Sequence, residues 1–101
     1  MAVQRNIYGE INSKTGMRKV FTSIRRNVDQ AKSRPALSEL YKRAGYLVTL
    51  THAPSWKKKF GHDAVQMRKV GEEEFGRTAR KINSRARKIN AQANYDEKWG
   101  K

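Results

Sequence analysis

The 101-residue chain contains no cysteine and only two prolines. Without cysteine it has neither a disulfide framework nor a thiolate metal site, so its redox compartment is unconstrained. Its longest apolar-leaning stretch, Tyr-Leu-Val-Thr-Leu at 46–50, is far too short to span a bilayer. The N-terminus also has no apolar run of signal-peptide length. We therefore expect a cytoplasmic protein with no membrane span.

Acidic residues are scarce as well, with 9 Asp and Glu against 23 Lys and Arg, and the formal net charge is +14. Such an imbalance says little about the fold, but it attracts nucleic acid, anionic lipid or an acidic protein partner. Hydrophobic residues make up 37% of the chain. This length and composition predict a single domain, 1–101, with one modest core.

Two runs near the N-terminus, 3–11 and 17–24, are rich in β-branched and aromatic residues. Between them, residues 12–16 supply the Asn and Gly that a short turn needs, so the segment predicts a β-hairpin. The near-continuous apolar run at 46–52 predicts a third, central strand that is covered on both faces.

The remaining segments favour helices. Ser23 can cap a first helix, Pro35 suits the first turn of a second helix, and Gly45 is a natural end for it. Residues 53–61 predict a loop, and Asp63 can cap a third helix. The predicted fold is a small α+β domain in the order ββααβαα, with a long C-terminal helix. The expected helices span 24–33, 35–44, 64–70 and 72–95.

The pentapeptide Ala-Arg-Lys-Ile-Asn occurs twice in the expected C-terminal helix, at 79–83 and 86–90. Its apolar residues belong to a stripe at helical spacing, which predicts packing against the protein's own sheet or the preceding helix. Because about three heptads are sustained, a self-associating coiled coil, and with it a homodimer, is an alternative. The stripe consists of Phe75, Ala79, Ile82, Ala86, Ile89 and Ala93.

The back of the same helix is basic, and no acidic residue occurs between Phe75 and Tyr95. Like charges three or four residues apart on a helix repel by a few tenths of a kcal/mol per pair. This uncompensated repulsion is most easily understood if a polyanion lies on the helix, so we predict contacts with nucleic-acid phosphates. The predicted contact residues are Arg77, Arg80, Lys81, Arg85, Arg87 and Lys88.

A second basic cluster falls in the expected loop 55–61, where three lysines stand between two aromatic residues. Such a loop can hold a phosphate backbone and stack bases. The alternative is that the aromatic rings anchor the loop while the lysines point to solvent. This cluster consists of Trp56, Lys57, Lys58, Lys59 and Phe60.

Catalysis would have to use His52 and His62, the two histidines of the chain. Neither has a partner at metal-ligand spacing, so we expect no metal and no cofactor. General acid–base chemistry on RNA, as in small toxin-type ribonucleases, is one alternative function. We predict instead a non-enzymatic protein that binds DNA or RNA. The competing class is a protein-interaction module that binds an acidic partner subunit.

Overall fold

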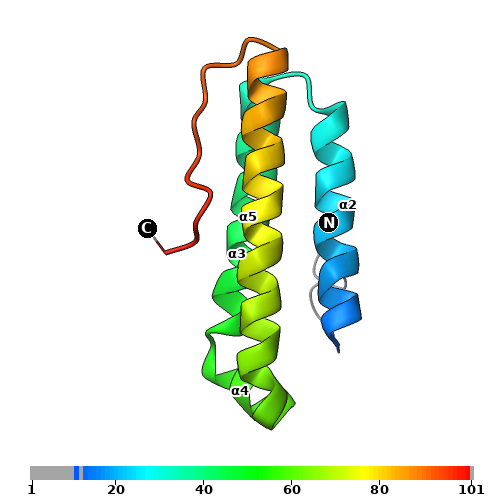
Figure 1. Ribbon diagram of the computed structural model, residues 1–101, viewed down its shortest axis with the longest axis vertical. Coiled ribbons are helices and arrows are strands. Elements are labelled where there is room, and N and C mark those ends of the chain that lie inside the picture. Colours follow the sequence, from blue (N-terminus) through cyan, green and yellow to red (C-terminus); the bar gives the residue numbers. More distant parts are fainter. Residues whose placement is uncertain (1–10, 12, 101) are drawn as a thin grey trace.

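The computed structural model describes residue 11 and residues 13–100, and this part of the chain is helical with no strand. Three long helices lie side by side, and a short helix with a 3₁₀ turn connects the second to the third at one end of the bundle (Figure 1). Residues 89–100 then run back along the bundle as a tail without regular structure. The elements are α2 (Lys14–Gln30), α3 (Arg34–Thr51), α4 (Pro54–Phe60), η1 (Gly61–Asp63) and α5 (Ala64–Lys88).

The α+β fold predicted from the sequence is wrong. The expected strand 17–24 lies inside α2, and the expected strand 46–52 forms the last turns of α3 and its C-cap. The other strand of the expected hairpin, 3–11, lies outside the described residues except for Ile11, which is buried and belongs to no strand. The order ββααβαα is therefore replaced by a bundle of α2, α3 and α5.

Helical spacing of apolar residues explains why α2 forms where a strand was expected. Met17, Phe21, Ile24 and Val28 follow one another at intervals of 4, 3 and 4, and all four are buried. Residues at this spacing lie on one face only if the segment is a helix. The burial of this face stabilises the helix more than the β-branched composition of the run favours a strand. Ser13, in the segment expected to be a hairpin turn, instead caps α2 by accepting a hydrogen bond from the Gly16 amide at 3.0 Å.

The same argument holds for α3, which begins at Arg34, one residue before the expected start, and carries Pro35 in its first turn. Gly45 does not end this helix, because the buried stripe continues past it through Leu47, Val48 and Thr51. A Cβ at Gly45 would lie 3.9 Å from the Phe75 ring, which is ordinary van der Waals contact. The apolar run 46–52 thus extends one face of a helix.

α5 joins the two expected helices, 64–70 and 72–95, into one continuous helix that ends at Lys88, seven residues early. Gly71 lies within it, where a Cβ would stand 3.5 Å from the Thr51 methyl group of α3. After Lys88 the chain turns at Asn90, whose φ of 58° lies in the left-handed region that Asn tolerates.

The apolar stripe of α5 is buried by the chain itself, as predicted, but it packs on helices and not on a sheet. Phe75, Ala79, Ile82 and Ala86 are all buried in the same core as the stripes of α2 and α3. Ile89 and Ala93 lie beyond the helix and are partly buried against this core. Since the stripe is covered by the chain's own helices, it is not the seam of an intermolecular coiled coil in this structure.

Candidate nucleic-acid interface

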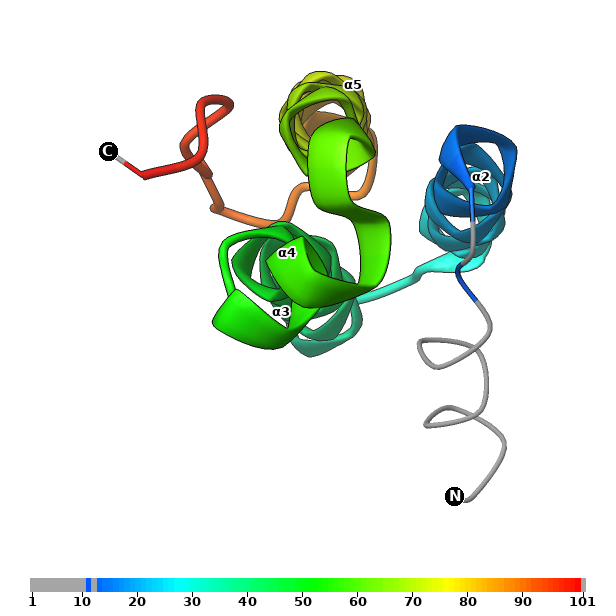
Figure 2. The same cartoon turned by 90° about the horizontal axis from the view of Figure 1, so that it is seen from below.

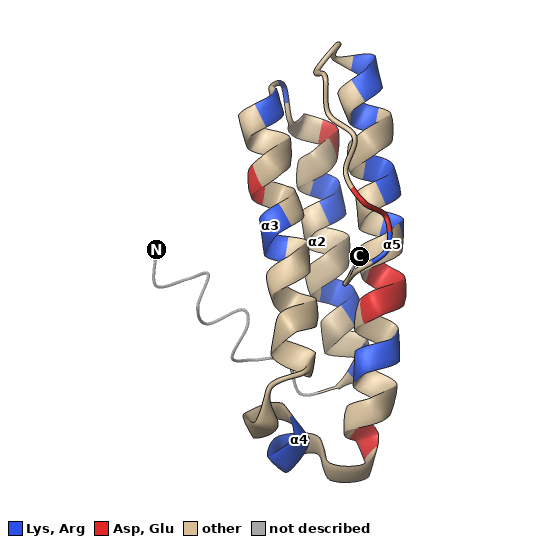
Figure 3. Cartoon of the chain, turned by 90° about the vertical axis from the view of Figure 1, so that its left-hand side faces the viewer, with Lys and Arg blue, Asp and Glu red and all other residues tan. Residues whose placement is uncertain are grey.

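Six basic residues lie on the half of α5 that ends at Lys88, and we call them the distal basic segment. Figure 3 shows blue bands recurring along this half of the helix, whereas the acidic residues of α5, at 72–74, lie nearer its middle. None of the six is buried: two are half-buried and four are exposed. The segment consists of Arg77, Arg80, Lys81, Arg85, Arg87 and Lys88.

Two members of this segment are held by α2. The Lys81 ammonium lies 3.1 Å from the Asp29 carboxylate. Arg85 donates from Nε to the Ala31 carbonyl oxygen at 2.9 Å, just beyond the end of α2. These contacts tie the C-terminal ends of α2 and α5 together, and they place the cations along the edge where the two helices meet.

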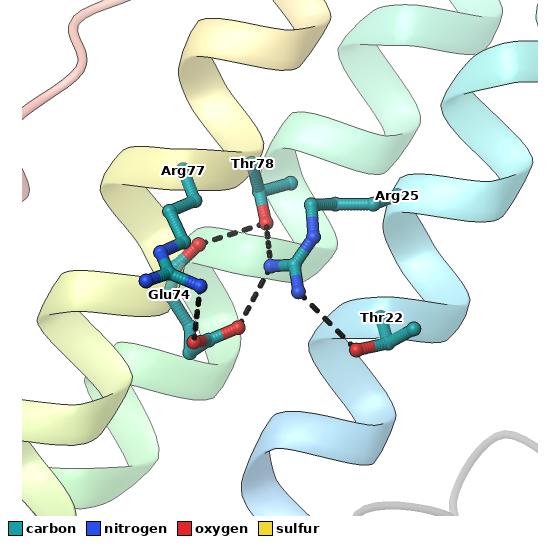
Figure 4. Close-up of polar contacts among 5 residues, drawn as sticks. All are labelled: Thr22, Arg25, Glu74, Arg77 and Thr78. Atoms are coloured by element: carbon teal, nitrogen blue, oxygen red, sulfur yellow. Dashed lines mark hydrogen bonds and ion pairs between the residues drawn. The ribbon is translucent and has the colours of Figure 1, made fainter.

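Glu74 supplies the other nearby carboxylate, but it is engaged mainly with Arg25 of α2 (Figure 4). Arg25 Nη1 lies 2.8 Å from Glu74 Oε1, while the second oxygen is 3.8 Å from Arg77 Nη1. Arg25 also donates to Thr78 at 3.3 Å and to Thr22 at 3.2 Å. Because Glu74 already pairs with Arg25, it compensates the charge of Arg77 only weakly.

The remaining three cations, Arg80, Arg87 and Lys88, form no ion pair with any residue that the structure describes. All three are exposed. The distal basic segment therefore offers three cations without an ion pair. Two further cations are weakly paired: the partner of Lys81 is exposed, and the partner of Arg77 is shared with Arg25. This arrangement suits an extended anion that lies along the helix.

The second predicted cluster is not a loop: it forms α4, and its aromatic residues turn inward. Trp56 is 7% exposed, and its ring centroid lies 4.8 Å from that of Phe60. Lys59 donates to the Ile11 carbonyl oxygen at 3.2 Å, whereas Lys57 and Lys58 are exposed. Trp56 thus anchors α4 to the bundle, and Phe60 is partly buried against the same core.

The structure does not bring the two predicted clusters together. α4 lies at the end of the bundle where α5 begins, and the distal basic segment lies toward the opposite end (Figure 1). A helix of 25 residues is about 37 Å long at 1.5 Å per residue. A ligand that covers Arg87 and Lys88 therefore has to extend over most of this length to reach α4.

The two histidines are also placed apart in the fold. His52 caps the end of α3, where it lies 3.2 Å from Glu72 and stacks on Trp99 with ring centroids 4.6 Å apart. His62 is exposed in η1. No contact among the described residues joins them into an acid–base pair, and residues 11 and 13–100 contain no group of three His, Asp or Glu that could hold a metal ion.

The C-terminal tail is a feature that sequence patterns did not indicate. Asn83, buried in α5, donates to the Tyr95 carbonyl oxygen at 2.8 Å and accepts from the Tyr95 amide at 2.7 Å. The Tyr95 hydroxyl bonds to Ser38, and the Tyr41 hydroxyl donates to the Asp96 carbonyl oxygen. The two asparagines of the repeated pentapeptide thus differ, since Asn83 clamps the tail and Asn90 makes the turn.

The tail and α2 lie on opposite sides of the α3–α5 pair (Figure 2). One edge of α5 is therefore covered by residues of the tail, and the edge toward α2 carries Lys81 and Arg85. This division leaves the outer side of α5, with the distal basic segment, as its accessible surface.

Comparison with known proteins adds no family to this description. No family model matches the chain, and neither a curated protein nor a solved structure matches it. Among residues 11 and 13–100, no helix combines the length and the apolar character needed to cross a membrane.

Proposed function

We propose that the protein binds nucleic acid without catalysing a reaction on it, and that it docks on the phosphate backbone through the distal basic segment. The observation that supports this is the charge of α5 between Arg77 and Lys88. Six cations lie within twelve residues, and the two carboxylates that contact them belong to Asp29 and Glu74. Phosphate contacts of this kind provide affinity through the release of condensed counterions.

The helix macrodipole offers a competing explanation for part of this charge. Cations in the last turn of a helix interact favourably with its C-terminal carbonyl groups. Arg85, Arg87 and Lys88 occupy the last turn of α5 and stabilise it even without a ligand. Arg77, Arg80 and Lys81 lie further back, where the dipole effect has decayed. Of these, Arg77 and Lys81 contact carboxylates and Arg80 forms no ion pair with a described residue, so a bound anion best explains Arg80.

The buried rings of α4 shape the proposed mode of binding. Base stacking needs an exposed aromatic face. Trp56 and Phe60 pack on each other and on the core, so we assign them no stacking role. Lys57 and Lys58 are left as a separate, smaller basic patch at the other end of the molecule.

An acidic protein subunit is the second candidate ligand. Arg77, Lys81, Arg85 and Lys88 follow one another at intervals of 4, 4 and 3, which places them in one row along α5. A row of this kind also matches a row of carboxylates on a partner helix.

A binding titration over a salt series tests the proposal. Duplex DNA, single-stranded DNA, structured RNA and polyglutamate are each titrated against the protein at several salt concentrations. If four to six phosphates are neutralised, the log–log slope on duplex DNA is about −4 to −5. Retained affinity with a flat salt response would contradict backbone docking. Tighter binding of polyglutamate than of any nucleic acid would favour the acidic partner.

A further inference from the structure

A small hollow of about 130 Å³ lies where the last turns of α5 meet the C-terminal end of α2. Four of its lining residues come from α5 at positions 81, 84, 85 and 88, which is the spacing of a single helix face. They bring three cations and one hydroxyl group to the hollow, against a single carboxylate from α2. The lining consists of Asp29, Lys81, Ser84, Arg85 and Lys88.

The donors of this hollow are partly held in place by the fold. Arg85 is fixed through Nε by the Ala31 carbonyl oxygen, and its terminal amino groups make no hydrogen bond with any other described residue. Lys81 is held by Asp29 at 3.1 Å, with side chains that are 39% and 64% exposed. Exposed ion pairs of this kind are weak, so Lys81 can exchange its partner at little cost.

We propose that this hollow is the seat of one phosphate group of the nucleic-acid backbone, an inference that rests on the proposed function. In this arrangement Lys81, Arg85 and Lys88 donate to the phosphate oxygens, and Ser84 donates through its hydroxyl group. Planar guanidinium groups and ammonium groups are the usual phosphate donors in proteins. The size of the hollow fits a compact anion, while the rest of the ligand lies outside it along α5.

Asp29 gives the site a counterion in the absence of ligand. It balances Lys81 when the hollow is empty, and it repels a phosphate that enters. Removing this carboxylate with Asp29→Asn therefore strengthens phosphate binding by about two- to fivefold, the size of effect usual for exposed charge pairs. The matched control is Glu39→Gln, which makes the same change of charge at an exposed position on α3.

Two probes test the seat directly: inorganic phosphate, followed by amide chemical shifts in NMR, and a short DNA duplex over a salt series. The variants are Ser84→Ala and Lys81→Gln, with Arg87→Gln as a control that removes one exposed charge from the same helix outside the hollow. Since none of these residues is buried, circular dichroism and thermal unfolding should match the parent protein.

We expect inorganic phosphate to shift the amides around residues 81–88 and Asp29 in the parent and in Arg87→Gln, and to lose this effect in Lys81→Gln. We expect Ser84→Ala to weaken duplex binding by about three- to tenfold with an unchanged salt slope, because a hydrogen bond but no charge is lost. Asp29→Asn should bind more tightly than Glu39→Gln.

The experiments distinguish an error in the proposed phosphate site from an error in the proposed function. If the duplex binds but Ser84→Ala behaves as the parent and Lys81→Gln behaves as Arg87→Gln, the function stands and the seat is wrong. If the parent binds no nucleic acid, the proposed function is wrong, and inorganic phosphate alone decides on the hollow. Phosphate shifts spread evenly over all basic faces would overturn the seat in either case.

Discussion

Arg25 of α2 and Glu74 of α5 form an ion pair of 2.8 Å whose side chains are only 20% and 6% exposed. The guanidinium group also donates to two threonine hydroxyls, those of Thr22 and Thr78 (Figure 4). The pair therefore links α2 to α5 through charged groups that are largely removed from solvent. Removal of Glu74 would leave Arg25 largely buried with no carboxylate partner, whereas removal of Arg25 would leave Glu74 with only the more distant Arg77 at 3.8 Å.

Glu74→Leu should therefore lower the free energy of unfolding by about 2–4 kcal/mol, since it leaves Arg25 largely buried beside neutral hydroxyls. Urea denaturation measures this loss. Asp29→Asn, which breaks the exposed pair with Lys81, should cost less than about 1 kcal/mol. The double variant Arg25→Met/Glu74→Leu should recover most of the stability, because no charge is then buried. Equal losses for Glu74→Leu and Asp29→Asn would contradict this account.

Gly76 permits the close approach of the tail to α5, and Gly76→Ala should loosen the tail. A Cβ at this position would lie 3.2 Å from the Glu97 carbonyl oxygen. The control is Gly45→Ala, also within a helix, where the nearest atom is 3.9 Å away. Both changes improve helix propensity by up to about 1 kcal/mol, so the difference between them reports the tail contact. Hydrogen exchange of residues 91–99 should become faster in Gly76→Ala alone.

Tyr41 should make part of the stability depend on alkaline pH. Burial of its phenol, with Asp96 and Tyr95 nearby, raises the pKa of Tyr41 above the ordinary 10.0. Above pH 10 the unfolded chain then loses this proton more readily than the folded chain, so stability is full below pH 10 and falls as the pH rises through the folded pKa. Ultraviolet absorbance of tyrosinate follows this titration.

Tyr41→Phe provides the test of this pH dependence. It should remove that part of the alkaline loss, and at neutral pH it should cost about 0.5–1 kcal/mol for the hydrogen bond to Asp96. An alkaline stability profile identical to that of the parent would show that another group is responsible.

The two neighbouring positions 86 and 87 should separate folding from binding. Ala86 is fully buried, so Ala86→Glu places a charge in the core and should lower the free energy of unfolding by more than about 3 kcal/mol. Arg87→Glu should cost at most about 1 kcal/mol through the helix dipole. It should weaken duplex binding and reduce the magnitude of the salt slope by about one. Unchanged duplex binding in folded Arg87→Glu would remove Arg87 from the interface.

The spacing of apolar residues predicted the fold better than the amino-acid composition of each segment did. The stripe of α5 was predicted because Phe75, Ala79, Ile82 and Ala86 alternate at 4 and 3, and all four are buried. The predicted strands are wrong because β-branched and aromatic composition alone does not determine secondary structure. The helical spacing of Met17, Phe21 and Ile24 is the feature that the fold follows. Once strand 46–52 is recognised as helix, Gly45 no longer marks an end.

The candidate site was accessible to sequence analysis only in part. The exposure of the basic residues of α5 follows from their position opposite the stripe. The phosphate-sized hollow does not, because it depends on where the end of α2, with Asp29 and Ala31, lies against Lys81 and Arg85. The tail could not be predicted either, since Asn83 meets Tyr95 through a contact that no local pattern encodes.

The two hydrogen bonds between Asn83 and Tyr95 restrict substitutions at position 83 more than at position 95. Asn83 contacts residue 95 through backbone atoms alone, and it also donates to the Glu97 carboxylate at 3.3 Å, so almost any side chain at 95 preserves the two hydrogen bonds to residue 95. Position 83 has no such latitude, because the clamp needs one donor and one acceptor on a short side chain, and Asp or Leu lacks one or both. The course of the tail is thus encoded in the helix it lies against.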